Sequence, residues 1–290
     1  MPSLIDIRRR IKSVKNTQQI TKAMKMVAAA RLRKAQDRVL NARPYARLFG
    51  EMLASVSAAA GASEDAAANP LFATREEKRI QLVLLTADRG FAGGFNTNLI
   101  KAAQAFLDDH PGLVQTELYG KKGRDFFRRR DIEVSGELTG TSENPTWDIA
   151  HALGQTLIQR YTSGEVDAVY LIFNEFKSVL SQRVVVQKLL PISVIPTGDA
   201  AAPPARDYIY EQPPADLLNV LLPRSVEIQV YQAFLESAAA EHAARMTAMD
   251  AATSNANEVI DKLTLYMNRV RQASITKEII EVVSGAAALE

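Results

Sequence analysis

Residues 249–280 read MDAATSNANEVIDKLTLYMNRVRQASITKEII, with apolar or small residues at alternating steps of three and four. The positions that share this spacing are Met249, Ala252, Ala256, Val259, Leu263, Tyr266, Val270, Ala273, Lys277 and Ile280. Such spacing over four heptads is typical of one strand of a left-handed coiled coil. The stretch lies within residues 225–290, which contain no proline, so the sequence predicts a helix far longer than a globular core requires.

The N-terminal segment, residues 1–60, supplies a partner helix. Its apolar stripe is expected at Leu4, Ile7, Ile11 and Val14, and then at Ile20, Met24 and Val27 after a polar gap. Ser3, with Asp6 three residues later, has the pattern of a helix cap, and Pro44 predicts a kink or an interruption.

Charge favours pairing of the two ends within one chain. Residues 1–47 carry thirteen Lys and Arg against two Asp, whereas residues 224–290 carry nine acidic residues against six basic ones. An antiparallel coiled coil would place the basic helix against the mildly acidic one. A coiled coil between two chains is the alternative, but it leaves the N-terminal stripe without an obvious partner.

The middle of the chain, residues 77–196, has the pattern of an α/β domain. Strands are expected at residues 80–86, 114–119, 132–134, 168–175 and 182–190, and helices at 97–108, 123–130 and 146–161. This alternation favours a mostly parallel, Rossmann-like sheet that ends in a hairpin. Residues 197–224 are expected to form a linker and residues 225–290 the last helix. The predicted fold class is therefore α/β, with a long antiparallel coiled coil of the N- and C-terminal helices and a Rossmann-like domain inserted between them.

Composition excludes several kinds of site. The chain has no cysteine, which rules out disulfides, thiolate metal ligands and cysteine nucleophiles. Its three histidines, His110, His151 and His242, are far apart in the sequence, so no His-rich metal cluster is expected. No run of about 18 apolar residues is present, so no segment is expected to span a membrane.

The segment Asp88–Asn96, DRGFAGGFN, follows a predicted strand and precedes a predicted helix, where phosphate-binding loops lie. Its glycines lack the G-x-G-x-x-G spacing, and no Lys-Ser or Lys-Thr follows Gly94. A structural turn without a cofactor is therefore favoured.

From the residues alone, two other classes stay open. One is an α/β nucleotide enzyme with helical arms, which ATP hydrolysis by the isolated chain would identify. The other is a nucleic-acid binder that uses its basic N-terminal helix, which salt-sensitive DNA binding would identify. That helix has no aromatic residue before Tyr45, which argues against base stacking.

Three parts of the chain, the two terminal helices and the glycine turn, carry a family resemblance. The N-terminal helix contains IRRRI at residues 7–11 and NTQQITKAMKMVAA at residues 16–29. The C-terminal helix contains EHAARMTAM at residues 241–249 and RQASITKEI at residues 271–279. Together with DRGFAGGFN, these stretches resemble the gamma subunit of bacterial F-type (rotary) ATP synthases. The resemblance covers the whole chain and is weakest over residues 114–146 and 197–207.

The resemblance implies a non-catalytic rotor subunit of the central stalk. Such a subunit couples ion flow through the membrane ring to ATP synthesis at the beta subunits by turning inside the alpha/beta hexamer. The implied partners are the alpha and beta subunits, the epsilon subunit and the membrane c-ring, without nucleic acid or cofactor. The implied location is peripheral, on the cytoplasmic face of the bacterial inner membrane.

The resemblance also implies two contact sites. The collar and coupling contacts are Met24, Arg271, Gln272 and Thr276. The contacts of the foot, where the stalk meets the ring and epsilon, are Tyr208, Tyr210 and Glu211. Arg271, Gln272 and Thr276 lie off the predicted seam, and Met24 is expected close to them on the partner helix.

Overall fold

The computed structural model describes residues 3–60, 69–130, 132–192, 208 and 210–287. The chain divides into two units. The sheet unit is Ala29–Arg245, and the two-helix unit combines Met1–Ala28 with Met246–Glu290. Helices α1 (Leu4–Ala60) and α6 (Pro214–Ala287) each contribute residues to both units.

The sheet unit is built on five strands in the order β3-β2-β1-β4-β5. The strands are β1 (Ile80–Leu85), β2 (Val114–Tyr119), β3 (Val134–Leu138), β4 (Ala168–Phe176) and β5 (Gln182–Leu190). The first four are parallel and β5 pairs antiparallel with β4, which confirms the mostly parallel sheet and its final hairpin. The third strand begins where the sequence had placed its end, because β3 pairs with β2 through Val134–Leu138.

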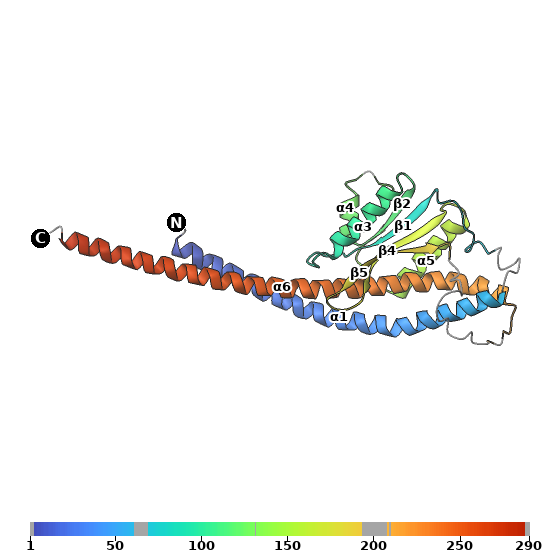
Figure 1. Cartoon of the computed structure of the whole chain (residues 1–290), viewed down its shortest axis with the longest axis horizontal. Coiled ribbons are helices and arrows are strands. Elements are labelled where there is room, and N and C mark those ends of the chain that lie inside the picture. The colour runs from blue at the N-terminus through green and yellow to red at the C-terminus, as the bar shows by residue number, and fades with distance from the viewer. Residues whose placement is uncertain (1–2, 61–68, 131, 193–207, 209, 288–290) are drawn as a thin grey trace. The chain divides into compact units, whose positions relative to one another are not determined.

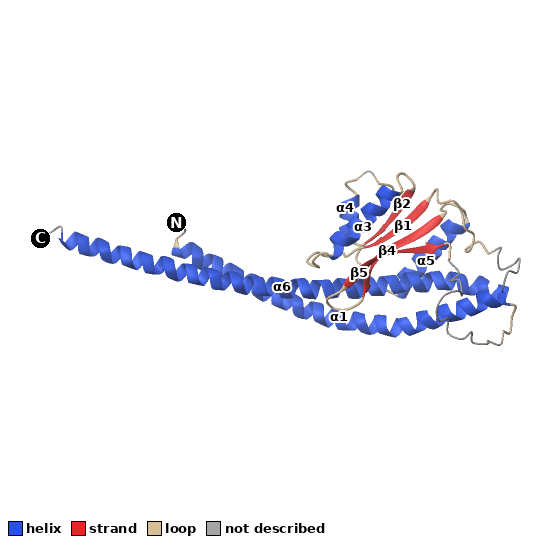
Figure 2. Ribbon diagram, in the orientation of Figure 1, coloured by secondary structure: helices blue, strands red, loops and turns tan. Residues whose placement is uncertain are grey.

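Helices cover both faces of this sheet (Figures 1 and 2). α3 (Phe95–Asp109) and α4 (Lys121–Phe127) follow β1 and β2 on one face, where an ideal Cβ on Gly123 would lie 3.5 Å from Leu84. On the other face, Val83 and Leu85 join a buried cluster with α5 (Trp147–Thr162) and the first part of α6. Every residue of β1 is buried, as expected for a central strand covered on both sides.

Pro44 does not interrupt α1, contrary to the sequence-based expectation. A proline within a helix removes one backbone hydrogen bond and costs about 3 kcal/mol. Arg43, the preceding residue, is held by Glu236 Oε1 at 2.9 Å, Glu236 Oε2 at 3.0 Å and the carbonyl of Phe176 at 2.9 Å. These tertiary contacts, together with the buried Val39 and Phe49 on either side, offset that loss.

Helix α6 begins at Pro214, eleven residues before the expected start, and contains Pro223. The carbonyl of Pro213 accepts hydrogen bonds from the amides of Asp216 and Leu217, so the chain enters the helix there. Proline is well tolerated at the first position of a helix. Leu218 and Leu222 are buried in the sheet-unit core, which holds the helix through Pro223.

In the two-helix unit, α1 and α6 run antiparallel. Lys25 bonds to Asp250, Thr21 to Thr253 and Gln18 to Asn257, so residue numbers rise on one helix as they fall on the other. The cap at the start of α1 is also present, because the Asp6 amide donates to Ser3 Oγ at 3.2 Å and the Ser3 amide to Asp6 Oδ2 at 3.3 Å. The antiparallel pairing of the terminal helices is confirmed.

The seams of both helices differ from the expected ones. On α1 the facing residues continue without a gap, at steps of three and four, through Leu4, Ile7, Ile11, Val14, Gln18, Thr21, Lys25 and Ala28. Ile20 and Val27, which were expected in the stripe, are exposed. On α6 the facing residues shift by one position after Ala256, so Ile260 and Met267 are half-buried where Val259 and Tyr266 were expected.

The C-terminal end of α6 extends beyond its partner. The register that pairs Lys25 with Asp250 brings Leu4 level with Arg271. The expected seam residues Ala273, Lys277 and Ile280 are therefore exposed, because the described part of α1 no longer faces them.

Candidate functional site: partner-binding surfaces

The glycine turn that follows β1 is rigidly anchored. Asp88 accepts hydrogen bonds from the amides of Lys121, at 3.1 Å, and Ser142, at 3.1 Å, and its own amide donates to Ser142 Oγ at 3.0 Å. Burial alone would raise the pKa of Asp88, but hydrogen bonds from Gly140, Ser142 and Lys121 keep that pKa below its ordinary value. Its carboxylate is thus used as a structural acceptor within the fold.

Phe91 is displayed at the tip of this turn. Its φ is 61°, in the left-handed region, and its side chain is 75% exposed. A bulky residue in this conformation is uncommon and persists where the surroundings dictate it. A large aromatic side chain held outward on a rigid turn is suited to contact another protein.

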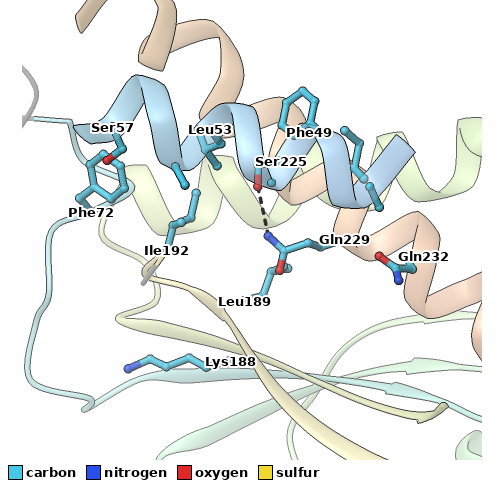
Figure 3. A pocket seen from close by; sticks show the side chains of 14 residues that line it. Phe49, Leu53, Ser57, Phe72, Lys188, Leu189, Ile192, Ser225, Gln229 and Gln232 are labelled. Carbon is cyan, nitrogen blue, oxygen red and sulfur yellow. Dashed lines mark hydrogen bonds between the residues drawn. The ribbon is translucent and has the colours of Figure 1, made fainter. Parts of the chain in front are cut away.

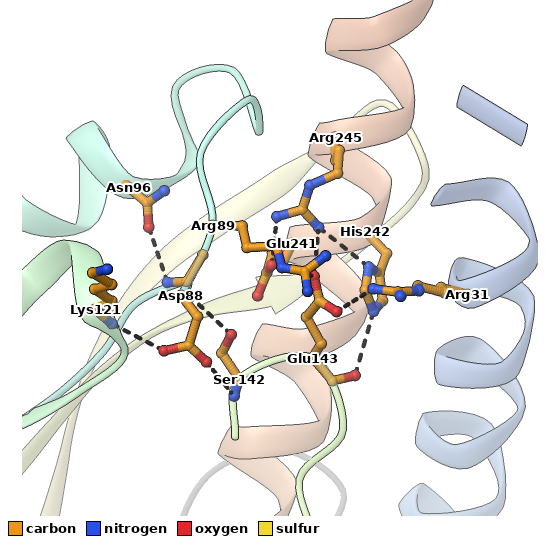
Figure 4. A network of polar contacts seen from close by, with 11 residues as sticks. Arg31, Asp88, Arg89, Asn96, Lys121, Ser142, Glu143, Glu241, His242 and Arg245 are labelled. Carbon is orange, nitrogen blue, oxygen red and sulfur yellow. Dashed lines mark hydrogen bonds and ion pairs between the residues drawn. The ribbon is translucent and has the colours of Figure 1, made fainter. Parts of the chain in front are cut away.

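Glu143 connects the loop before α5 to both long helices. Its carboxylate pairs with Arg31 of α1, lies 3.7 Å from Arg89 Nε in the glycine turn and 3.9 Å from Arg245 Nη1 of α6. Figure 4 shows these arginine side chains converging on Glu143 from three directions. All belong to the sheet unit, where this cluster ties the turn to α1 and α6.

Two neighbours in this cluster have shifted pKa values. Burial raises the pKa of Glu241, and Arg245, whose Nη2 lies 2.6 Å from its carboxylate, partly opposes the shift. Burial lowers the pKa of His242, which favours the neutral ring, with Nε2 3.4 Å from the carbonyl oxygen of Glu143. Both groups are almost fully buried and act within the fold.

A pocket of about 260 Å³ lies between α1, α6 and the end of β5 (Figure 3). Its apolar lining includes Phe49, Leu53, Phe72, Leu189 and Ile192. Two of its polar groups bond to each other, since the Gln229 amide nitrogen donates to Ser225 Oγ at 3.2 Å. Lys188, at the rim, pairs with Glu77 at 2.6 Å, so this lining is not arranged to bind a phosphate.

The structure does not bring Met24 close to the other three predicted collar residues. Arg271, Gln272 and Thr276 are exposed on α6, and Thr276 Oγ1 donates to the carbonyl of its own helix at Gln272, at 3.0 Å. Met24, next to Lys25, lies level with Asp250, twenty-one residues before Arg271. At 1.5 Å per residue this is roughly 30 Å along the helix, so the expected proximity of Met24 to the other three is wrong.

The predicted foot residues lie in the sheet unit. The rings of Tyr208 and Tyr210 are 6.5 Å apart, and Tyr210 packs against the core cluster. Glu211 is exposed just before α6 begins. Residues 193–207 and 209, which include the first part of the expected linker, lie outside the described residues.

The described residues contain no group of three or more His, Asp or Glu side chains that could hold a metal ion. Within the same residues, none of the helices is both long and apolar enough to cross a bilayer.

Comparison with known proteins places these features in a family. The family model described as ATP synthase matches residues 3–289. A protein named ATP synthase gamma chain from Solibacter usitatus is 60% identical over 291 residues, across the full length of both chains. The chain belongs to the ATP synthase gamma chain family. Gamma chains of an Anaeromyxobacter strain and of Pelotomaculum thermopropionicum match equally completely, at 52% and 48% identity.

Solved structures agree with the fold. A chain of the Tetrahymena thermophila mitochondrial ATP synthase central stalk and c-ring matches with a TM-score of 0.62 at 24% identity, covering 80% of this chain and 99% of that one. A chain of the Euglena gracilis mitochondrial ATP synthase matches with a TM-score of 0.68 at 16% identity, covering 99% and 94%. At these identities the likeness shows a shared fold.

Sequence reasoning missed Phe91, Glu143 and His242 as notable residues. Glu143 and the arginines around it are more than fifty residues apart in the sequence, and no spacing rule connects them. An available signal was Phe91 itself, an aromatic residue between the glycines of a turn.

Proposed function

We propose that this chain is the central-stalk rotor subunit of an ATP synthase, which couples ion flow through a membrane ring to ATP synthesis by turning inside an alpha/beta hexamer. The observation that carries the proposal is the unpaired end of α6. Its exposed apolar residues are Ile275, Ile279, Ile280, Val282 and Val283. A run of exposed aliphatic side chains such as this one marks a contact with another protein. Apolar contacts are not directional, so a helix surrounded by an apolar collar is able to turn within it.

The polar residues near this end are proposed to grip the collar. Arg271 and Gln272 are exposed, and no salt bridge of the described residues involves Arg271, so its guanidinium is available to a partner. The Thr276 hydroxyl donates a hydrogen bond to the Gln272 carbonyl of its own helix, and its oxygen can still accept one from a partner. Met24, roughly 30 Å away along the helix, is proposed as a separate contact.

Tyr208, Tyr210 and Glu211, just before α6 begins, are proposed to meet the c-ring and the epsilon subunit. Two neighbouring tyrosines beside an exposed carboxylate suit a contact surface. The location proposed for the chain is peripheral, on the cytoplasmic face of the bacterial inner membrane, through its attachment to the ring.

The chain itself is proposed to be non-catalytic. The Asp88 carboxylate in the glycine turn accepts hydrogen bonds from within the fold, and in the apolar pocket Gln229 donates to Ser225. Isothermal titration of the isolated chain with ATP should therefore give no binding. Micromolar binding, or ATP hydrolysis by the isolated chain, would favour the enzyme class instead.

The grip is tested in complexes reassembled with alpha, beta and epsilon subunits. Arg271→Leu and Gln272→Leu should each lower ATP turnover by about tenfold, because each removes a strong polar contact with the collar. Arg269→Leu, an exposed arginine two residues earlier, is the matched control and should leave turnover unchanged. Unchanged turnover in all three variants would show that other residues make the polar contacts with the collar.

The polarity of the stalk is tested by crosslinking. The chain has no cysteine, so Tyr208→Cys and Tyr210→Cys provide single reactive thiols. Their crosslinks should reach the ring or epsilon, and crosslinks restricted to alpha or beta would reverse the proposed orientation.

A further inference from the structure

Three polar pairs cross between α1 and α6 in consecutive turns of the two-helix unit. They are Gln18 with Asn257, Thr21 with Thr253, and Lys25 with Asp250. The two threonine hydroxyls are 2.8 Å apart, and Lys25 Nζ lies 2.6 Å from Asp250 Oδ1. We refer to these three pairs as the polar ladder.

The same stretch of α1 carries a more apolar face that is turned away from α6. Ile20 is 60% exposed and Val27 is 53% exposed, whereas Thr21 is 9% exposed and Ala28 is 1% exposed. Each exposed aliphatic residue immediately precedes a buried small or polar one. The two faces are therefore offset by one residue, which is about 100° around a helix.

Burial of apolar area alone would favour the other face. Turning Ile20 and Val27 toward α6 would remove two large aliphatic side chains from water, and the residues now facing α6 are a threonine and an alanine. Other interactions must therefore stabilise the observed orientation of α1, in which Thr21 and Ala28 face α6. Part of this stabilisation comes from Ile7, Ile11 and Val14, which are buried or half-buried on the side of α1 that faces α6.

The polar ladder supplies the rest of this stabilisation, in the segment of α1 where Ile20 and Val27 alternate with Thr21 and Ala28 as candidates for burial. Polar groups in a helix seam specify alignment, at some expense in stability, because an alternative alignment removes their cross-helix partners. The own-helix acceptors of Thr21 and Thr253, the carbonyls of Gln18 at 3.0 Å and Met249 at 2.7 Å, would remain, so the alignment preference rests on the contact between the two hydroxyls. Lys25 and Asp250 are largely exposed, so that pair contributes little stability. The least exposed rung is Thr21, which is buried, with Thr253, which is half-buried.

We propose that the polar ladder is a positioning element that sets the rotational phase of α1 against α6 and keeps Ile20 and Val27 on the outer face. The outward apolar residues are then presented to the surrounding subunits, a role that rests on the proposed rotor function. α6 supports the inference, because Val259 is also turned outward while its neighbour Ile260 faces α1.

Single-cysteine labelling of the isolated full-length chain tests the phase directly, since the chain has no native cysteine. Val27→Cys should react with a maleimide much faster than Ala28→Cys. Adding Thr21→Val with Thr253→Val removes both hydroxyls while nearly conserving side-chain volume. In that background the ratio of the two rates should fall by about fivefold, the effect of losing one net hydrogen bond.

The matched control is Thr21→Ser with Thr253→Ser, which keeps both hydroxyls and should retain the native ratio. An unchanged ratio in the valine background would overturn the proposal. An equal fall in the serine background would also overturn it, because packing of the methyl groups would then be responsible.

A second readout uses reassembled complexes. The valine pair should lower the number of ions pumped per ATP hydrolysed while hydrolysis continues, and the serine pair should not. Because labelling needs no assembly, a chain that failed to assemble with alpha and beta subunits would refute the rotor function and leave the phase measurement intact.

Discussion

At the scale of the residue, Phe91 holds a backbone conformation that glycine adopts freely. The hydrogen bonds of Asp88 and Asn96 on either side, including that from the Ala87 amide to Asn96 Oδ1 at 2.9 Å, dictate this conformation. Residues held in such regions cost about 1–3 kcal/mol each, and they concentrate at contact sites.

Phe91→Gly should therefore raise the free energy of unfolding by about 1 kcal/mol, because glycine relieves the strain. Phe91→Ala retains a Cβ and should bring no such gain, which makes it the matched control. Denaturant unfolding of the isolated chain measures both. Equal stability of the two variants would show that the φ of 61° carries no strain.

His242 makes stability depend on pH. Burial holds its pKa below the ordinary 6.5, so between the folded value and 6.5 the unfolded chain binds a proton that the folded chain does not. Stability is then present above pH 6.5 and is lost as the pH falls, with a slope of up to about 1.4 kcal/mol per pH unit. The positive charges of Arg245 and Arg31 also lower the pKa of His242, because they repel a protonated ring.

His242→Gln should remove this slope, as measured by unfolding at a series of pH values. The raised pKa of Glu241 acts with the opposite sign, since that contribution is lost as the pH rises above its ordinary 4.5. Because Glu241 is common to both proteins, the difference between them isolates His242. Parallel pH profiles would contradict the assignment.

At the scale of the element, the two long helices show why a heptad pattern alone misassigned half of a seam. Leu263 and Val270 belong to both the expected and the observed seams of α6. Before Val270 the two seams differ only at neighbouring residues, such as Val259, which was expected to face α1, and Ile260, which does face it. Both residues are aliphatic, and the pattern favours neither strongly.

The observed seam predicts unequal mutational effects at these neighbours. Ile260→Ala should lower the free energy of unfolding by about 1 kcal/mol or more, because Ile260 faces α1. Val259→Ala, its matched control on the exposed side, should change it by about 0.5 kcal/mol or less. Thermal unfolding followed by circular dichroism measures both, and a reversed order would restore the strict heptad seam.

At the scale of the whole molecule, burial differs greatly among the parts of α6. Leu218 and Leu222 are in the core of the sheet unit, Met249 and Ala256 face α1, and residues beyond Arg271 have no described partner helix. Local stability follows buried apolar contacts, so the ends of one continuous helix should open at very different rates.

Hydrogen exchange followed by mass spectrometry should thus show a gradient along α6 of the isolated chain. Residues 272–284 should exchange fastest, residues 249–263 more slowly, and residues 218–234 most slowly. In an assembled complex the protection of residues 272–284 should increase, because the collar would cover them. Uniform protection along α6 in the isolated chain would contradict this reading of its contacts.

Much of the sheet unit was predictable from local pattern. The fully apolar run of β1 and the spacing of α3 and α5 gave element positions within a few residues, because burial on both faces leaves a clear sequence signal. The continuity of α1 through Pro44 was not predictable, since the contacts of Arg43 with Glu236 and Phe176 join residues more than 130 positions apart.

Local properties of the sequence were sufficient to predict two long terminal helices that pair with each other and an α/β domain between them in the chain. These properties are the apolar periodicity, the stretch without proline over residues 225–290 and the opposite charge balance of the two ends. Which face of each helix is buried depends on tertiary contacts, because two amphipathic faces offset by one residue satisfy nearly the same pattern. Residues that meet across the two helices, such as Thr21 and Thr253, become neighbours only after the chain has folded back on itself.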